Sequence, residues 1–194
     1  MSLYKAIRES VKNEPPELRR NRLAEWRRSN AVERIARPTN LSKARSLGYR
    51  AKQGIILART RVLRGGRQRP LMKGGKRPRT RRRKKILGMN YQQICEQRAN
   101  KKFINCEVLN SYYANEDGRF IWYEVILVDK NHPAIINDPK LKWLTEKQHT
   151  GRVFRGLTRA GDKARGFMHK GKGTEKLRPS RAAVIRHKRR RLDI

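Results

Sequence analysis

Residues 34–95 contain twenty Lys and Arg side chains and no Asp or Glu. Residues 96–146, in contrast, hold seven basic and eight acidic side chains, and residues 147–194 return to a basic excess of sixteen to three. A nearly neutral segment between two strongly cationic ones is typical of a folded body with arms that bind a polyanion. The neutral segment is therefore where a hydrophobic core is expected.

The whole chain carries a net charge of +35, and a free globular protein with this charge would repel itself. Nucleic acid, an anionic membrane surface or an acidic protein could each neutralise it. No run of about 18 apolar residues could span a bilayer, and the N-terminal residues lack the apolar core of a secretory signal. Two cysteines, Cys95 and Cys106, are too few for a disulfide framework, so we expect a reducing, cytoplasmic setting.

Two segments of the neutral region have the apolar patterns of strands. Residues 104–108 alternate apolar and polar side chains, which predicts a half-buried strand. Residues 120–128 are almost continuously apolar, which favours a central strand covered on both faces. Residues 110–118 between them are rich in turn-forming residues and include Asp117-Gly118. We therefore expect an antiparallel pair.

Residues 53–63 form a third candidate strand. The odd-numbered positions from 55 to 63 carry aliphatic residues together with Arg59 and Arg61. The even-numbered positions from 56 to 62 carry small or β-branched residues: Ile56, Ala58, Thr60 and Val62. This second set could face a core, while the two arginines could face RNA.

The N-terminal residues predict two helices. In the first, three aliphatic residues share one face: Leu3, Ile7 and Val11. The proline pair at 15–16 ends this helix. Residues 17–32 predict a second, basic helix with Leu18 and Trp26 directed inward.

A further helix is predicted where four residues fall at helical spacing: Tyr91, Ile94, Cys95 and Arg98. Asn90, with Gln93 three residues later, is a plausible N-cap. The order helix, helix, basic loop, strand, basic loop, helix, strand, strand, short helix and basic tail predicts an α+β body of moderate size.

The basic segments have a composition of their own. Residues 64–88 combine Lys and Arg with two Gly-Gly pairs and two prolines, so the backbone can approach phosphate closely and does not close into a helix. In an RNA crevice each Arg can bridge phosphate oxygens or stack on an unpaired base. Residues 151–173 and 178–191 repeat this basic character. A nuclear-localisation-like or solubilising run is the alternative, but it does not account for the whole acid-free stretch.

Residues with catalytic or metal-binding chemistry are sparse. The four histidines are far apart and no Cys-x-x-Cys accompanies them, so a zinc site is disfavoured and both cysteines are expected to be small buried apolar residues. No phosphate-binding loop motif occurs. Five carboxylates of the neutral segment could hold a nuclease metal, although balancing nearby Lys and Arg is the simpler interpretation: Glu107, Glu116, Asp117, Glu124 and Asp129.

Several blocks of sequence carry a family resemblance. Residues 37–70 are the longest block, and residues 108–128 and 155–166 follow in the same order, with Tyr4-Lys5 near the start. Together they resemble ribosomal protein fifteen of the large subunit, in its archaeal and eukaryotic type. The resemblance implies a small, largely antiparallel sheet with packed helices and long basic extensions ordered by RNA. It also implies large-subunit rRNA and neighbouring ribosomal proteins as partners, and no catalytic role, metal or cofactor.

The resemblance implies that the basic residues within its blocks face RNA: Arg37, Lys43, Arg45, Arg50, Lys52, Arg59, Arg61, Arg64, Arg67, Arg69, Arg155, Arg159, Lys163 and Arg165. Charge alone adds the basic residues outside them: Lys73, Lys76, Arg77, Arg79, Arg81, Arg82, Arg83, Lys84, Lys85, Arg152, Lys170, Lys172, Arg178, Arg181, Arg186, Lys188, Arg189, Arg190 and Arg191.

We expect three parts: an N-terminal helical segment (1–36), an α+β body (37–146) with an inserted basic RNA-binding loop at about 64–90, and a basic C-terminal extension (147–194). The leading hypothesis is a structural constituent of the large subunit of the cytoplasmic ribosome, bound to no membrane and not a homo-oligomer. An architectural protein that compacts nucleic acid is the first alternative. An RNA-processing enzyme that uses the carboxylates of the neutral segment is the weaker one.

Overall fold

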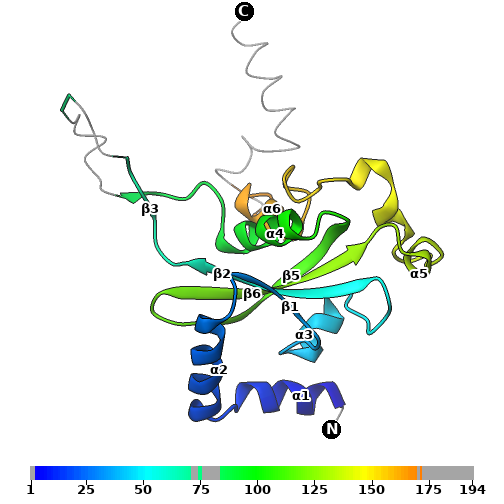
Figure 1. Cartoon of the computed structure of the whole chain (residues 1–194), viewed down its shortest axis with the longest axis horizontal. Coiled ribbons are helices and arrows are strands. Elements are labelled where there is room, and N and C mark those ends of the chain that lie inside the picture. Colours follow the sequence, from blue (N-terminus) through cyan, green and yellow to red (C-terminus); the bar gives the residue numbers. More distant parts are fainter. Residues whose placement is uncertain (1–2, 71–73, 76–83, 170, 172–194) are drawn as a thin grey trace, which may run out of the picture.

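The computed structural model describes residues 3–70, 74–75, 84–169 and 171. Its centre is a four-stranded antiparallel sheet of order β1-β2-β6-β5 (Figure 1). The strands are β1 (Val32–Ile35), β2 (Ile55–Leu63), β5 (Cys106–Glu116) and β6 (Phe120–Asp129). This small antiparallel sheet with its packed helices confirms the predicted α+β class.

Helices cover both faces of the sheet. On one face lie α4 (Tyr91–Lys102) and, packed on it, α6 (Arg159–Ala164); on the other lie α1 (Leu3–Lys12), α2 (Pro16–Arg28) and α3 (Leu41–Ser46) (Figure 1). The short α5 (Pro133–Ile136) and the 3-10 turns η2 (Lys142–Thr145) and η3 (Lys147–His149) follow β6. Two further strands, β3 (Arg67–Gln68) and β4 (Lys84–Lys85), form a separate hairpin.

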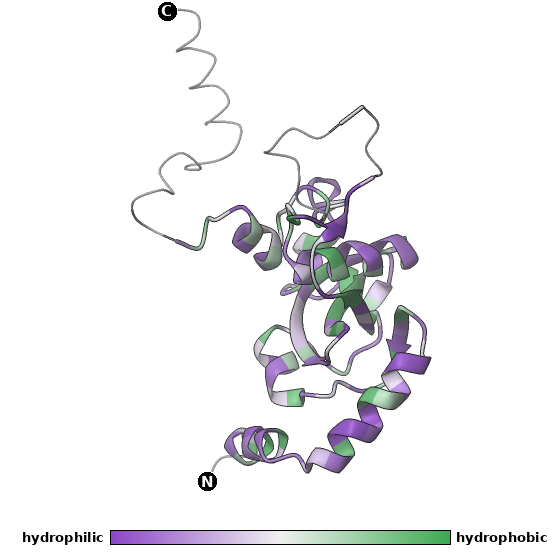
Figure 2. Cartoon of the chain, turned by 90° about the vertical axis from the view of Figure 1, so that its left-hand side faces the viewer, coloured by the Kyte–Doolittle hydropathy of each residue, from purple (hydrophilic) through white to green (hydrophobic). Residues whose placement is uncertain are grey.

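Strand β6 is one of the two inner strands of the sheet, as its continuous apolar sequence predicted. One of its faces packs against α4 with three buried aliphatic residues: Ile121, Val125 and Leu127. The other packs against α2, α3 and residues 133–144 with Trp122, Ile126 and Val128. Burying each such side chain stabilises the fold by roughly 1.5–3 kcal/mol. Figure 2 shows the apolar positions gathered in the middle of the body, with hydrophilic positions predominating in the outer helices.

The predicted N-cap of α4 is also confirmed. The Asn90 side chain accepts a hydrogen bond of 2.7 Å from the backbone N–H of Gln93. Cys95 on this helix and Cys106 on β5 are free and buried, as expected of small apolar residues. Burial raises the pKa of the Cys95 thiol and raises that of Cys106 to about 11, so both are neutral thiols at physiological pH.

The prediction for residues 104–118 was wrong in its boundaries. Ile104 is 84% exposed, and β5 begins at Cys106 and continues to Glu116 through residues that were expected to form a turn. These polar residues remain extended because they pair with β6, with irregular register after Val108 and Tyr113. Only the bend around Asp117 joins the two strands.

The second N-terminal helix was also predicted too long. Helix α2 ends at Arg28, because Val32–Ile35 pairs with β2 as strand β1 instead of continuing the helix. Leu18 is 56% exposed, contrary to expectation, whereas Leu23 and Trp26 are buried. The first predicted helix is present as Leu3–Lys12, but none of its residues is buried and Leu3 is 68% exposed.

Candidate nucleic-acid interface

About half of the basic residues predicted to bind RNA lie outside the described residues. They are Lys73, Lys76, Arg77, Arg79, Arg81, Arg82, Arg83, Lys170, Lys172, Arg178, Arg181, Arg186, Lys188, Arg189, Arg190 and Arg191. The others divide into exposed cations and cations that hold the fold together.

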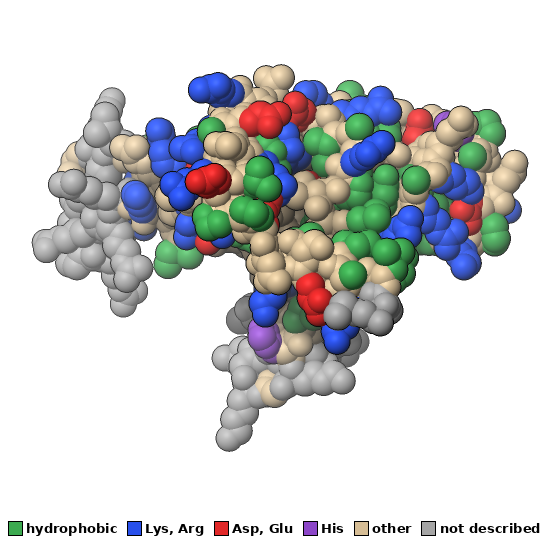
Figure 3. All heavy atoms as spheres, turned by 90° about the horizontal axis from the view of Figure 1, so that it is seen from below, with side chains coloured by type: hydrophobic (Ala, Val, Ile, Leu, Met, Phe, Trp, Pro, Cys, Tyr) green, Lys and Arg blue, Asp and Glu red, His purple; other side chains and the backbone are tan. Residues whose placement is uncertain are grey.

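The exposed cations make no side-chain hydrogen bond or ion pair with another residue that the structure describes: Arg37, Lys43, Arg50, Arg67, Lys84, Lys85, Arg159 and Lys163. They lie on three parts of the fold, namely the β3–β4 hairpin, α6, and α3 with the residues on either side of it. Figure 3, which views the side of α1 and α2, shows Lys and Arg distributed over this face with fewer acidic side chains between them.

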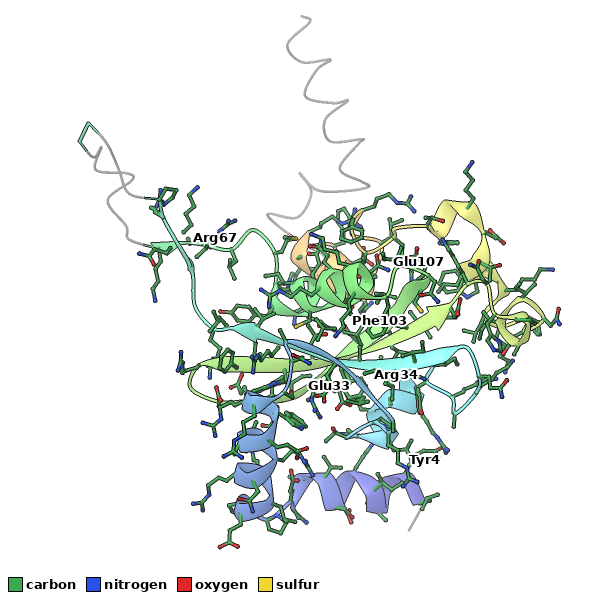
Figure 4. The ribbon with its side chains drawn as sticks, in the orientation of Figure 1. Tyr4, Glu33, Arg34, Arg67, Phe103 and Glu107 are labelled. Atoms are coloured by element: carbon green, nitrogen blue, oxygen red, sulfur yellow. The ribbon has the colours of Figure 1, made fainter. Side chains whose placement is uncertain are left out.

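The densest group of exposed cations lies on the β3–β4 hairpin, which projects from one end of the body, as the labelled Arg67 in Figure 4 shows. Arg67 pairs with Lys85 across the two strands, and Gln68 pairs with Lys84. Like charges directly opposite each other destabilise a strand pair. The two strands of the hairpin lie close together at Gly66, since a Cβ atom there would lie 2.6 Å from the Lys85 carbonyl oxygen. This hairpin therefore gathers positive charge that the protein does not neutralise with a carboxylate among its described residues.

Arg59 and Arg61 lie on the face of β2 that α2 covers, while Ala58 and Val62 belong to the core beneath α4, as predicted. The Arg59 guanidinium lies 4.3 Å from the centre of the Trp26 ring and 2.7 Å from a Glu33 carboxylate oxygen, and its side chain is only 13% exposed. Arg61 donates a hydrogen bond of 2.6 Å to the Arg27 carbonyl oxygen. These two arginines attach α2 to the sheet, and their contact with RNA stays a prediction.

Arg152 has a comparable role on the other side of the body. Its guanidinium donates to the carbonyl oxygens of Val108 (2.9 Å) and Leu157 (3.0 Å) and lies 5.0 Å from the centre of the Trp143 ring. Burial lowers the pKa of this arginine. Arg152 therefore fastens the segment after η3 to β5.

Five further predicted cations have partners within the protein. Lys52 binds Asp138 at 2.8 Å, and this hydrogen bond lowers the pKa of the Asp138 carboxyl. Arg45 donates to the Tyr4 hydroxyl, Arg64 to the Asp117 carbonyl, Arg155 to two carbonyls of the preceding turn, and Arg165 to the Asp162 carboxylate. Arg69 is half-buried.

The carboxylates of the neutral segment do not gather at one point. Asp117 lies 3.6 Å from Arg27, and Glu116 lies 3.7 Å from Arg64, so these two carboxylates pair with arginines. Glu124 is fully buried and accepts hydrogen bonds from the Thr39 N–H (3.0 Å) and from the hydroxyls of Thr39 and Tyr112. Within the described ranges, no three His, Cys, Asp or Glu side chains form a group that could hold a metal ion.

Sequence reasoning missed an apolar cavity at the base of the hairpin, between β4 and α4. Its local signal in the sequence was the apolar group of Ile86, Leu87 and Met89 directly after the basic run that ends at Lys85. The tyrosines that complete the cavity, Tyr91 and Tyr123, come from a helix and a strand that the fold brings beside this strip.

In the described part of the chain, no helix combines the length and apolarity needed to cross a bilayer. A family model described as "Ribosomal L15" matches residues 2–184. The match includes every block that carries the sequence resemblance and nearly the whole chain. The chain therefore belongs to the Ribosomal L15 family of archaeal and eukaryotic type, whose members are structural constituents of the large subunit of the cytoplasmic ribosome.

Proposed function

We propose that this protein binds folded large-subunit rRNA with its cationic segments and so allows converging RNA helices to pack. The body fixes the points from which these segments leave. The observation that carries the proposal is the β3–β4 hairpin, where Arg67 faces Lys85 and Lys84 is exposed beside them. Phosphate groups would convert this like-charge pair from a destabilising contact into a binding surface.

The basic residues fall into two groups, those bound within the protein and those exposed to solvent, and this also supports RNA binding. Arg59, Arg61 and Arg152 are occupied with carbonyl oxygens, aromatic rings or a carboxylate of the protein. The exposed cations, in contrast, are free to meet phosphate. We infer that the first group determines where the second is presented, and that neighbouring ribosomal proteins contact the remaining surface.

Binding of the full chain to a folded large-subunit rRNA fragment, measured over a series of salt concentrations, tests this proposal. Log affinity should fall with log salt by about 0.7–0.9 for each phosphate engaged. Replacing Arg67, Lys84 and Lys85 by Ser should reduce this slope by about two to three. The matched control replaces three exposed lysines elsewhere on the body by Ser: Lys101, Lys140 and Lys142.

Equal slopes for the two triple variants would contradict the role of the hairpin. Failure of the native protein to co-sediment with large subunits at physiological salt, or a stable preference for duplex DNA over folded RNA, would overturn the proposal itself. An RNA-cleaving enzyme would lose turnover with an intact fold when Glu124 and Asp129 are replaced by their amides. A scaffold should show effects on stability alone.

A further inference from the structure

The cavity at the base of the hairpin has a volume of about 800 Å³. This volume lies within the range of roughly 300–1,000 Å³ that is usual for ligand-binding clefts, and the depression is open to solvent on one side. Its lining combines two kinds of residue. Ile86, Met89, Tyr91 and Tyr123 give it apolar and aromatic walls, and Lys84 and Lys85 stand beside them on β4.

Contacts within the protein hold the two aromatic side chains of the cavity in place. The Gly65 N–H donates a hydrogen bond of 2.7 Å to the Tyr91 hydroxyl, which in turn lies 3.3 Å from the Gly65 carbonyl oxygen. Tyr91 is the first residue of α4, next to the Asn90 cap. Tyr123 lies on β6, and its ring meets that of Tyr113 edge-on with centres 6.1 Å apart. Both rings are therefore fixed before any ligand arrives.

Ile86 is 82% exposed and Met89 is 40% exposed, so the cavity presents large apolar side chains to solvent. These residues follow directly on Lys84 and Lys85, at the end of a stretch, residues 34–95, that contains no acidic side chain. A purely apolar partner would leave these lysines uncompensated. A nucleotide satisfies both requirements, because its base is a flat aromatic surface and its phosphate is an anion.

We infer that this cavity receives an unpaired base of the RNA, stacked against its aromatic and aliphatic walls, while Lys84 and Lys85 bind the adjoining phosphates. The inference rests on the proposed RNA-binding function and adds a base-binding site to it. Stacking against a protein side chain is tolerant of base identity, so the site would select an unstacked nucleotide and not a sequence.

The test uses the full chain and a hairpin RNA with a single 2-aminopurine in its loop, compared with the same RNA abasic at that position. The unsubstituted protein should quench the 2-aminopurine fluorescence and prefer the base-containing RNA by about tenfold. A variant with Ile86→Ser and Met89→Ser should lose both effects. The matched control replaces Ile104 (84% exposed) and Met168 (36% exposed) by Ser, and it should behave as the unsubstituted protein does.

Three results would overturn the inference. If the cavity variant retains the quenching and the preference, the base does not enter this cavity. If the unsubstituted protein binds both RNAs equally, it binds phosphates only. The cavity would then be a binding site for an apolar segment of a neighbouring protein. If the unsubstituted protein binds neither RNA, the proposed function fails as well, which distinguishes that failure from the first two.

Discussion

The Thr158 hydroxyl donates a hydrogen bond of 2.6 Å to the Glu96 carboxylate, and so joins α4 to the N-terminal cap of α6. The Ser111 hydroxyl on β5 donates to the other carboxylate oxygen at 2.5 Å. Glu96 is fully buried. Burial raises the pKa of its carboxyl, although the two hydroxyls and the nearby Arg152 act in the opposite direction. The buried Glu96 carboxylate thus connects α4 and β5 to the start of α6.

The raised pKa of Glu96 predicts an unusual pH dependence. Its contribution to stability is present below the pKa of the unfolded chain and is lost as pH rises through the higher pKa of the folded state. Glu96→Gln keeps the shape of the side chain without its charge. In this variant the free energy of unfolding should no longer fall as pH rises between those two pKa values. At neutral pH it should equal or exceed that of the unsubstituted protein. Urea unfolding at a series of pH values checks the prediction, and an unchanged curve would contradict it.

Glu96→Ala should have a different outcome from the Gln variant. It removes the acceptor of two buried hydroxyls, those of Ser111 and Thr158. The two hydroxyl oxygens keep the donors Gln92 and Gly161, but each O–H loses its acceptor, and a buried donor left unsatisfied costs about 1–3 kcal/mol. The free energy of unfolding should fall by at least this amount, while Ser111→Ala, which removes one donor and leaves the carboxylate bound to Thr158, should cost less.

Arg59 should act on stability more than on RNA binding, because its guanidinium is enclosed between Trp26 and Glu33. A cation over an aromatic ring contributes about 0.5–2 kcal/mol, depending on desolvation. Arg59→Ala should therefore lower the free energy of unfolding by about 1–3 kcal/mol with no change in the salt dependence of RNA binding. Glu33→Gln is the control, and a smaller loss is expected because Glu33 is 38% exposed. A reduced salt slope in a folded Arg59 variant would show that it meets phosphate.

Arg59 also shows why part of the structure could not be predicted from the sequence. The helix at Tyr91 and the strand at 120–128 were predictable, because a nearby cap and a continuous apolar run specify them locally. The partners of Arg59 come from α2 and β1, and an arginine in a strand gives the same local signal whether it meets a phosphate or an indole ring. The length of α2 was overestimated for a related reason. Pairing of Val32–Ile35 with β2 is a long-range contact that outweighs the helical pattern.

Loss of the Glu124 carboxylate should release the segment before α3. The Thr39 N–H and hydroxyl both bind Glu124, and this attaches the chain around Arg37 to β6. In Glu124→Ala the Thr39 amide should exchange with solvent markedly faster, because its acceptor is gone. Hydrogen exchange resolved by residue measures this directly. Tyr112→Phe removes only the third donor to Glu124 and should leave Thr39 protected. Equal exchange in both variants would mean that Glu124 does not hold this segment.

Gly66→Ala should disrupt the β3–β4 hairpin without affecting the body. A Cβ at this position would lie 2.6 Å from the Lys85 carbonyl oxygen, so the two strands would have to separate and the group of Arg67, Lys84 and Lys85 would lose its geometry. Affinity for rRNA should fall by about tenfold, which corresponds to ~1.4 kcal/mol, while the urea midpoint stays unchanged. Gly118→Ala is the matched control, since a Cβ there has no heavy atom within 4 Å. If the two variants bind RNA equally well, the close pairing of this hairpin is not what presents the cations to RNA.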